Sequence, residues 1–306
     1  MNLKKVTKLR RFFFLGDQWL SMKIYSGPKS LEQLLLNEIK EIVERCYSEQ
    51  IIEQFFFIRY IDPDYHLRLR FKVNNQKNLG TLITLLNKKL QKYVDNRMIW
   101  DIVADTYKRE IERYGECTME HIESLFSFES SMLLSYLSSN QESAKMDRWL
   151  WGFLFIDKYL THFNMSLEEK VIFFDELRTE YMQEFSITKE NIIKLDKKYR
   201  KESIHLNYYL SADVNDVPNY DLIESYFANT KFTFDLINEY FENKRVEVPR
   251  KYIIGSLVHM FLNRLFRSKQ RNYELVIYYL MYKFYNSVKA RKKYRKNFSS
   301  KIFEIC

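Results

Sequence analysis

Residues that interrupt regular secondary structure are scarce in this chain. Its 306 residues include only 6 glycines and 4 prolines. Because these residue types most often end helices and strands, their scarcity predicts long uninterrupted elements, mostly helices. Hydrophobic residues make up 46% of the chain and charged residues 29%, which excludes the apolar-poor composition of a disordered protein. We therefore expect a folded protein with a sizeable core.

Cysteines and long apolar runs are also scarce. The three cysteines, Cys46, Cys117 and Cys306, are odd in number and widely spaced, which argues against a disulfide framework. The basic N-terminal segment is followed only by the short apolar run FFFL, unlike a signal peptide. No run approaches the ~18 to 20 apolar residues that span a bilayer. These features predict a cytoplasmic protein without membrane insertion.

The sequence lacks the motifs of several familiar chemistries. It has no glycine-rich phosphate loop, no HExxH or CxxC metal pattern and no GxSxG nucleophile motif. The histidines are scattered singly, so we expect neither a metal nor a cofactor. A catalytic site in this chain would have to use arginine, histidine and carboxylate side chains.

The first third of the chain has the pattern of a sheet with helices. Alternating and β-branched or aromatic residues predict a hairpin of two strands around the turn IDPDY (61–65), where Pro63 fixes the backbone. Apolar spacing predicts a helix after a Ser30 cap. The expected elements are strands at 18–25, 51–60, 66–73 and 96–107, and helical segments at 30–47, 77–93 and 108–115.

From about residue 118 the pattern is helical nearly to the end, with long amphipathic segments at 220–244 and 252–266. The sequence therefore predicts an α+β fold that is predominantly helical. It has a small mixed or antiparallel sheet contributed mainly by the first third. No linker or repeat divides the chain, so we expect one domain over 1–306, with a β-containing part at about 1–117 and a helical part at about 118–306.

The segment HLRLRF (66–71) carries the first candidate site. A strand would place His66, Arg68 and Arg70 on one face and the apolar residues between them on the other. Two neighbouring guanidiniums on a rigid strand suit carboxylate or carbonyl oxygens, because arginine stays charged and can bind with two nitrogens. A solvated strand face with no such role has the same pattern.

Two further features have a structural and a functional reading. Glu110 and Arg113 are three apart, a spacing that suits a surface ion pair as well as a site. His259 lies in the apolar helical segment VHMFLNRLF with Asn263 one turn later. A histidine there can exchange protons near neutral pH, but it can equally be a hydrogen-bonded core residue.

Taken in order, WLSMKIY, FFFIRYIDPDYHLRLRF, EIERYG and HMFLNRLF resemble the C-terminal elimination domain of class I lantibiotic dehydratases and its free-standing relatives from thiopeptide pathways. The longest motif, FIRYxDPxxHLRLR, is the most specific part. The resemblance implies a lyase that removes glutamate from glutamylated Ser or Thr of a ribosomal precursor peptide, leaving dehydroalanine or dehydrobutyrine. The site residues that it implies are Arg68, Arg70, Glu110, Arg113 and His259.

The resemblance also implies the partners. The substrate would be a glutamylated precursor peptide, and a separate tRNA-dependent enzyme would attach the glutamate, since this chain is too short to include the larger glutamylating domain. The chain itself would need no direct nucleic-acid contact, and formation of a homodimer is left open. His259 would transfer the α-proton, the arginines would hold carboxylates and stabilise charge, and Glu110 would orient one of them.

Two rival functions remain. The same scaffold is used by the pyridine synthases of thiopeptide pathways, which join two dehydroalanines in a formal [4+2] cycloaddition. Alternatively, the net charge of +9, much of it in the segment KARKKYRKNFSSK (289–301), would suit a non-catalytic basic module that recruits tRNA or another anionic partner. An ordinary solvated helix end explains the same segment.

Overall fold

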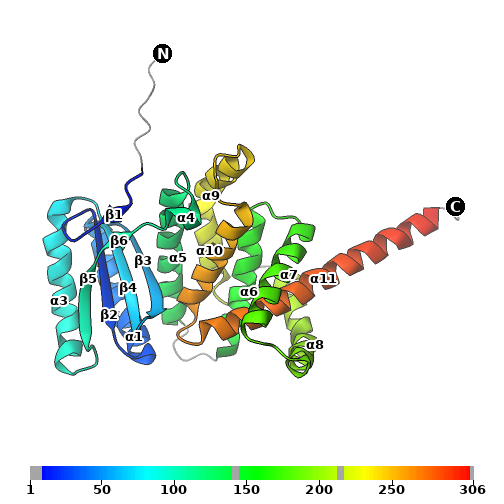
Figure 1. The fold of residues 1–306 in the computed structure, drawn as a ribbon, viewed down its shortest axis with the longest axis horizontal. Coiled ribbons are helices and arrows are strands. Elements are labelled where there is room, and N and C mark those ends of the chain that lie inside the picture. Colours follow the sequence, from blue (N-terminus) through cyan, green and yellow to red (C-terminus); the bar gives the residue numbers. More distant parts are fainter. Residues whose placement is uncertain (1–8, 140–144, 212–216, 304–306) are drawn as a thin grey trace, which may run out of the picture. The chain divides into compact units, whose positions relative to one another are not determined.

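The computed structural model describes residues 9–139, 145–211 and 217–303. The first part contains all the strands found in these ranges, and the remainder is helical (Figure 1). The predicted α+β, mostly helical class is therefore confirmed. The elements up to residue 139 are β1 (Phe12–Phe13), β2 (Trp19–Tyr25), α1 (Pro28–Leu34), a π-helical segment (Leu35–Ile39), α2 (Lys40–Ser48), β3 (Ile52–Ile61), β4 (Tyr65–Val73), a 3-10 turn (Gln76–Asn78), α3 (Leu79–Asp95), β5 (Asp101–Asp105), β6 (Tyr107–Lys108), α4 (Ile111–Tyr114) and α5 (Met119–Ser139). They are followed by α6 (Lys145–His162), α7 (Leu167–Glu184), α8 (Lys189–Ser211), α9 (Tyr220–Glu242), α10 (Arg250–Leu265) and α11 (Gln270–Phe303).

The chain forms two compact units. The first comprises Met1–Glu142 and Glu224–Ser268, and the second comprises Ser143–Ile223 and Lys269–Cys306. The first unit contains the sheet and every candidate site residue. Whether the chain behaves as a single domain stays a prediction.

The main sheet is antiparallel with the strand order β3-β4-β2-β5, and the predicted hairpin is its β3–β4 pair. Arg70 lies opposite Phe56 and Arg68 lies opposite Ile58. Side chains on directly opposed residues of an antiparallel pair lie on the same face. The register therefore places both arginines on one face of the sheet, together with Tyr60, which lies opposite His66.

The other face of the sheet is packed into the core. Leu67, Leu69 and Phe71, which alternate with the arginines, are all 0% exposed. The helices α1 and α2 contact β4 and β3 respectively, and α3 contacts α2. Fully burying a side chain of this size contributes about 1.5 to 3 kcal/mol. This apolar layer makes the strand that presents Arg68 and Arg70 a rigid support.

The outer edge of β3 faces the helices α5 and α10 (Figure 1), and side chains of both helices bond to its backbone. The hydroxyl of Ser127 on α5 accepts a hydrogen bond from the Phe55 amide, at 3.1 Å. Asn263 on α10 accepts from the Arg59 amide at 2.9 Å and donates to the Arg59 carbonyl at 2.8 Å. Uncovered strand edges invite pairing with other chains. These contacts satisfy the edge and fix α10 beside β3.

Two predictions about element ends were wrong. The helix expected from residue 30 begins at Pro28 after Gly27, and no side-chain cap is made. Proline at the first helical position needs no amide partner and has a helical φ, so Ser30 is not required as the cap. The strand expected at 96–107 begins only at Asp101, after a turn in which Arg97 has φ 55°. It is then divided into β5 and β6, because β5 pairs with β2 and β6 pairs with β1.

The second unit is a set of helices joined by partly buried polar contacts. The Lys170 amine donates to the Asp157 carboxylate at 2.8 Å, and the Tyr285 hydroxyl donates to the same carboxylate oxygen at 2.7 Å. These bonds link α6, α7 and α11. Within the ranges that the structure describes, no helix has both the length and the apolar character needed to cross a membrane.

Candidate functional site

Arg70 is held on β4 against two aromatic rings. Its guanidinium carbon lies 4.2 Å from the ring centre of Tyr107 and 5.4 Å from that of Phe56. Its Nε is buried and has no hydrogen-bond partner among the described residues. Burial lowers the pKa of Arg70, and the negative charge of Glu110 acts in the opposite direction. A buried donor without an acceptor is costly, and the rest of this half-buried guanidinium keeps its charge, so the position favours an anionic ligand.

Arg68 is also stacked on a tyrosine. Its guanidinium carbon lies 3.6 Å from the ring centre of Tyr60. Its Nε donates to Nε2 of His66 at 3.1 Å. Stacking uses the flat face of a guanidinium and leaves the N–H groups at its edge for a ligand. Arg68 and Arg70 thus form a pair of supported cations on the sheet.

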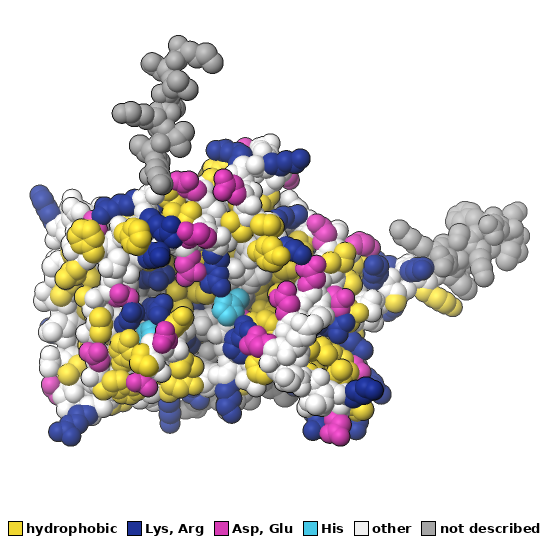
Figure 2. All heavy atoms as spheres, viewed as in Figure 1, with side chains coloured by type: hydrophobic (Ala, Val, Ile, Leu, Met, Phe, Trp, Pro, Cys, Tyr) yellow, Lys and Arg dark blue, Asp and Glu magenta, His cyan; other side chains and the backbone are white. Residues whose placement is uncertain are grey.

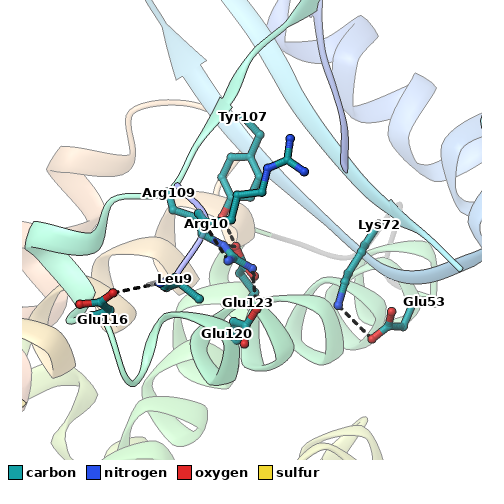
Figure 3. A network of polar contacts seen from close by, with 9 residues as sticks. All are labelled: Leu9, Arg10, Glu53, Lys72, Tyr107, Arg109, Glu116, Glu120 and Glu123. Atoms are coloured by element: carbon teal, nitrogen blue, oxygen red, sulfur yellow. Dashed lines mark hydrogen bonds and ion pairs between the residues drawn. The ribbon is translucent and has the colours of Figure 1, made fainter. Parts of the chain in front are cut away.

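Tyr107, the ring on which Arg70 stacks, belongs to a buried polar network with Arg109 and Glu123 (Figure 3). The Tyr107 hydroxyl donates to Glu123 at 2.6 Å, and Arg109 donates to both oxygens of Glu123 at 2.7 Å each. Arg109 and Glu123 are each 1% exposed. A buried bidentate ion pair is rigid because both partners lose contact with water together. The network therefore fixes the ring on which Arg70 rests.

Glu110 and Arg113 form an exposed ion pair. Glu110 precedes α4, and its carboxylate accepts from Arg113 at 3.0 Å, with side-chain exposures of 52% and 43%. The positive charges of Arg113 and Arg70 act on the buried Tyr114 hydroxyl, although burial is the larger effect and raises the pKa of Tyr114.

Gly115 ends α4 at φ 80°, and a Cβ there would lie 2.9 Å from Val246. Glycine is required at that turn.

His259 is half-buried on α10. Ser256 precedes it by three residues and Asn263 follows it by four, so the three share a helix face. Ser256 lines a cavity, while Asn263 is bonded to Arg59 on β3. His259 is thus placed between the cavity and the edge of the strand next to Arg68.

The cavity has a volume of about 1090 Å³ and lies within the first unit. Its walls come from α4, the start of α5, the end of α9 and the start of α10, and include Arg113, Gly115, His121, Tyr240, Tyr252 and Ser256. Pockets of about 300 to 1,000 Å³ hold drug-sized ligands. This volume accommodates several residues of a peptide.

The structure brings some of the expected residues together more directly than others. Arg68 and Arg70 share one sheet face. Glu110 and Arg113 form an ion pair, and their charges act on the Tyr114 hydroxyl, as does that of Arg70. His259 is connected to them through α10, which contacts both α4 and β3. The roles assigned to these five residues stay predictions.

Two tyrosines that stack on the arginines were missed. Tyr107 was assigned only to a strand, and its distance in sequence from Arg70 gave no signal of the stacking. Tyr60 could have been found by counting outward from the 61–65 turn, because it lies opposite His66, which was expected on the arginine face of the strand. Among the residues that the structure describes, no group of three or more His, Cys, Asp or Glu is placed to hold a metal ion.

Comparison with known families identifies the fold. Residues 19–285 match the family "Lantibiotic biosynthesis dehydratase C-term". The chain belongs to this family. The subtilin biosynthesis protein SpaB of Bacillus subtilis is 28% identical over 255 residues, which are 82% of this chain and 24% of SpaB. The nisin biosynthesis protein NisB of Lactococcus lactis subsp. lactis is 24% identical over 298 residues, 94% of this chain and 27% of NisB. The chain thus spans about a quarter of the length of these relatives.

Solved structures share the fold at low sequence identity. The tRNA-dependent lantibiotic dehydratase MibB from Microbispora sp. 107891 has a TM-score of 0.64 and 17% identity, over 92% of this chain and 29% of MibB. The pyridine synthase TbtD from thiomuracin biosynthesis has a TM-score of 0.61 and 11% identity, over 89% of this chain and 99% of TbtD. The same fold therefore occurs as part of a longer chain and as nearly a whole chain.

Proposed function

We propose that this chain is a lyase that eliminates glutamate from glutamylated Ser or Thr side chains of a ribosomal precursor peptide. The product would be dehydroalanine or dehydrobutyrine in a lanthipeptide or thiopeptide pathway. Membership of the dehydratase C-terminal family supports a role in dehydration. The single observation that carries the finer proposal is the buried Nε of Arg70, which has no acceptor among the described residues and stands beside a second arginine on a rigid strand.

The reaction needs a base and a positive environment. A base takes the Cα proton of the glutamylated residue, and its electron pair forms the Cα=Cβ bond. The bond between Cβ and the ester oxygen breaks, and glutamate leaves as a carboxylate. Negative charge therefore develops first on the adjacent peptide carbonyl and then on the leaving carboxylate. Both charges suit guanidinium donors.

We assign the roles as follows. His259 transfers the α-proton, because it is half-buried on α10 on the same helix face as Ser256, which lines the cavity. Arg68, Arg70 and Arg113 bind the carboxylates and stabilise the developing charge. Glu110, 3.0 Å from Arg113, orients that guanidinium. No step in this scheme uses a metal or a cofactor.

The partners follow from the same chemistry. The substrate is a precursor peptide that already carries glutamate, so a glutamylating activity must act before this site. MibB, which shares the fold, is described as tRNA-dependent. We propose that a separate tRNA-dependent enzyme supplies the glutamylated peptide in the cytoplasm and that the elimination site itself needs no nucleic acid.

The test is incubation with a peptide that bears a glutamyl ester on serine, followed by mass spectrometry. We expect loss of one glutamate per modified residue and formation of a thiol-reactive alkene. Arg70→Ala and His259→Ala should each lower the rate about 100-fold or more, because each removes a charge-stabilising donor or a positioned proton-transfer group. An ester that the wild-type protein leaves intact would contradict the proposal.

Matched controls separate lost chemistry from lost charge or fold. Arg45→Ala removes an exposed arginine whose ion pair with Glu49 lies on α2, and His205→Ala removes an exposed histidine on α8. Both should retain wild-type activity. Circular dichroism melts of all variants should show that Arg70→Ala and His259→Ala remain folded at the assay temperature.

A second candidate is supported by one observation, the shared fold with the pyridine synthase TbtD over 99% of that chain. This candidate would join two dehydroalanines of an already dehydrated peptide. Incubation with a dehydrated peptide distinguishes it from the lyase. Macrocycle formation, together with no reaction on the glutamyl ester, would favour the synthase.

A further inference from the structure

His66 is bonded on both ring nitrogens in the middle of the cationic face. The residue is 1% exposed. Its Nδ1 lies 2.9 Å from the Asp64 carbonyl oxygen, and its Nε2 lies 3.1 Å from Nε of Arg68. A carbonyl oxygen can only accept, so Nδ1 carries the hydrogen. In an uncharged ring Nε2 is then an acceptor, and the Arg68 Nε–H donates to it.

The rings around His66 restrict Arg68 further. Tyr25 and Tyr60 lie with their ring centres 4.6 Å and 5.5 Å from that of His66. The Arg68 guanidinium lies 3.6 Å above the Tyr60 ring centre. Stacking fixes the plane of the guanidinium, and the bond to His66 fixes its rotation within that plane. The remaining N–H donors of Arg68 are left for a ligand.

We propose that His66 is a positioning residue of the elimination site, which in its uncharged Nδ1–H form holds Arg68 so that the terminal guanidinium nitrogens face a substrate carboxylate. The inference rests on the proposed function and adds a residue that does not itself touch the substrate. A flexible arginine loses side-chain entropy when it binds a ligand. An arginine held in advance by His66 has already lost that freedom.

The charges around His66 favour the uncharged ring. Burial lowers the pKa of His66, and the positive charges of Arg68 and Lys23 act in the same direction. The Asp64 carbonyl and the Asp62 carboxylate oppose them. Protonation would place an N–H of the ring against the Nε–H of Arg68, which ends the hydrogen bond.

Two amide substitutions separate the two bonds of His66. In His66→Gln the amide oxygen can replace Nε2 as the acceptor for Arg68. In His66→Asn the shorter amide can replace Nδ1 as the donor to Asp64, and the acceptor is lost. We expect His66→Asn to lower kcat/KM on the glutamylated peptide about 10- to 100-fold, the usual effect of losing a hydrogen bond to a charged group. His66→Gln should keep most of the activity.

A double-mutant cycle tests whether His66 acts through Arg68. In an Arg68→Ala background, His66→Asn should cause no further loss, because the group that it positions is already absent. If His66 had a merely structural role, the loss of kcat/KM in the double variant would be the product of the losses in the two single variants. Equal losses in His66→Gln and His66→Asn, or multiplied losses in the double variant, would overturn the inference.

An NMR measurement that needs no turnover distinguishes this inference from the proposed function. With labelled arginine, the Arg68 Nε–H should exchange slowly in the wild type and in His66→Gln, and rapidly in His66→Asn. If the three proteins show these exchange rates but the wild type leaves the glutamyl ester intact, only the proposed function is overturned. An active wild type in which Arg68 Nε–H exchanges rapidly would overturn only the role of His66.

Discussion

At the scale of single residues, this protein places cations where water cannot fully reach them. Arg70 has a buried Nε without an acceptor and Arg109 is 1% exposed, but the second is matched by Glu123. A paired buried arginine such as Arg109 contributes to a rigid network. The buried, unpartnered Nε of the half-buried Arg70 is instead retained at a cost that a bound ligand can offset, as the proposed function requires.

The burial of His66 predicts that folding stability depends on pH. Its pKa in the folded protein lies below the ordinary value of 6.5, chiefly because of burial. Between these two pKa values the unfolded chain binds more protons than the folded one, so folding stability falls as the pH falls through this window. The loss should begin as the pH falls below about 6.5. The stability is fully present above that value.

A comparison with His66→Phe isolates this effect, since other titrating groups are common to both proteins. The free energy of unfolding, measured by urea denaturation between pH 5 and pH 8, should fall more steeply on acidification in the wild type than in the variant. A wild-type stability that falls no more steeply on acidification than that of the variant would contradict the assigned direction of the shift.

At the scale of elements, the hairpin could be predicted from sequence because alternation and the Asp-Pro turn act locally. Leu67 and Leu69 are buried and Arg68 lies between them on the opposite face, as the pattern required. The start of α1 was misjudged because Ser30 and Pro28 both resemble helix starts. Nothing local separates a capping serine from one already inside a helix.

The contacts between elements could not be predicted. The sequence indicated His259 and Asn263 as one helix face but gave no sign that Asn263 would cover the edge of β3. The stacking of Arg70 on Tyr107 depends on the pairing of β6 with β1 and on the Glu123 network. Such pairings depend on the whole folded unit rather than on local preferences.

The contact between α5, α10 and β3 gives a prediction about stability. Arg264 and Glu129 are both 0% exposed, and an Nη1 to Oε1 distance of 2.5 Å joins them, while Arg264 also donates to the Phe57 carbonyl at 2.8 Å. Arg264→Met would leave Glu129 buried without its cation. Removing one partner of a buried ion pair typically costs about 3 to 5 kcal/mol in the free energy of unfolding.

Urea unfolding followed by circular dichroism measures this loss. Arg113→Met is the control, because it breaks an exposed pair and should cost less than about 1 kcal/mol. The double variant Arg264→Met/Glu129→Met should lose less unfolding free energy than the sum of the losses in the two single variants. Equal effects of Arg264→Met and Arg113→Met would contradict the prediction.

At the scale of the whole molecule, charge is distributed unevenly along the chain. The side of the molecule seen in Figure 2 has basic side chains interspersed with acidic and hydrophobic ones. The concentrated basic run begins at Lys289 on α11, where Lys289 to Tyr294 are exposed. This run belongs to the second compact unit, whereas every candidate site residue belongs to the first.

The rival reading as a basic binding module can therefore be tested by truncation. A chain ending at Val288 should eliminate glutamate from a pre-glutamylated peptide at the wild-type rate, because the residues removed contribute nothing to the proposed chemistry. The same assay on full-length His259→Ala should show the large loss. If the truncated chain were inactive at low and at moderate salt while His259→Ala remained active, the basic segment would carry the function and the lyase proposal would be wrong. Wild-type activity in the truncated chain would instead assign that segment to an ordinary solvated helix end.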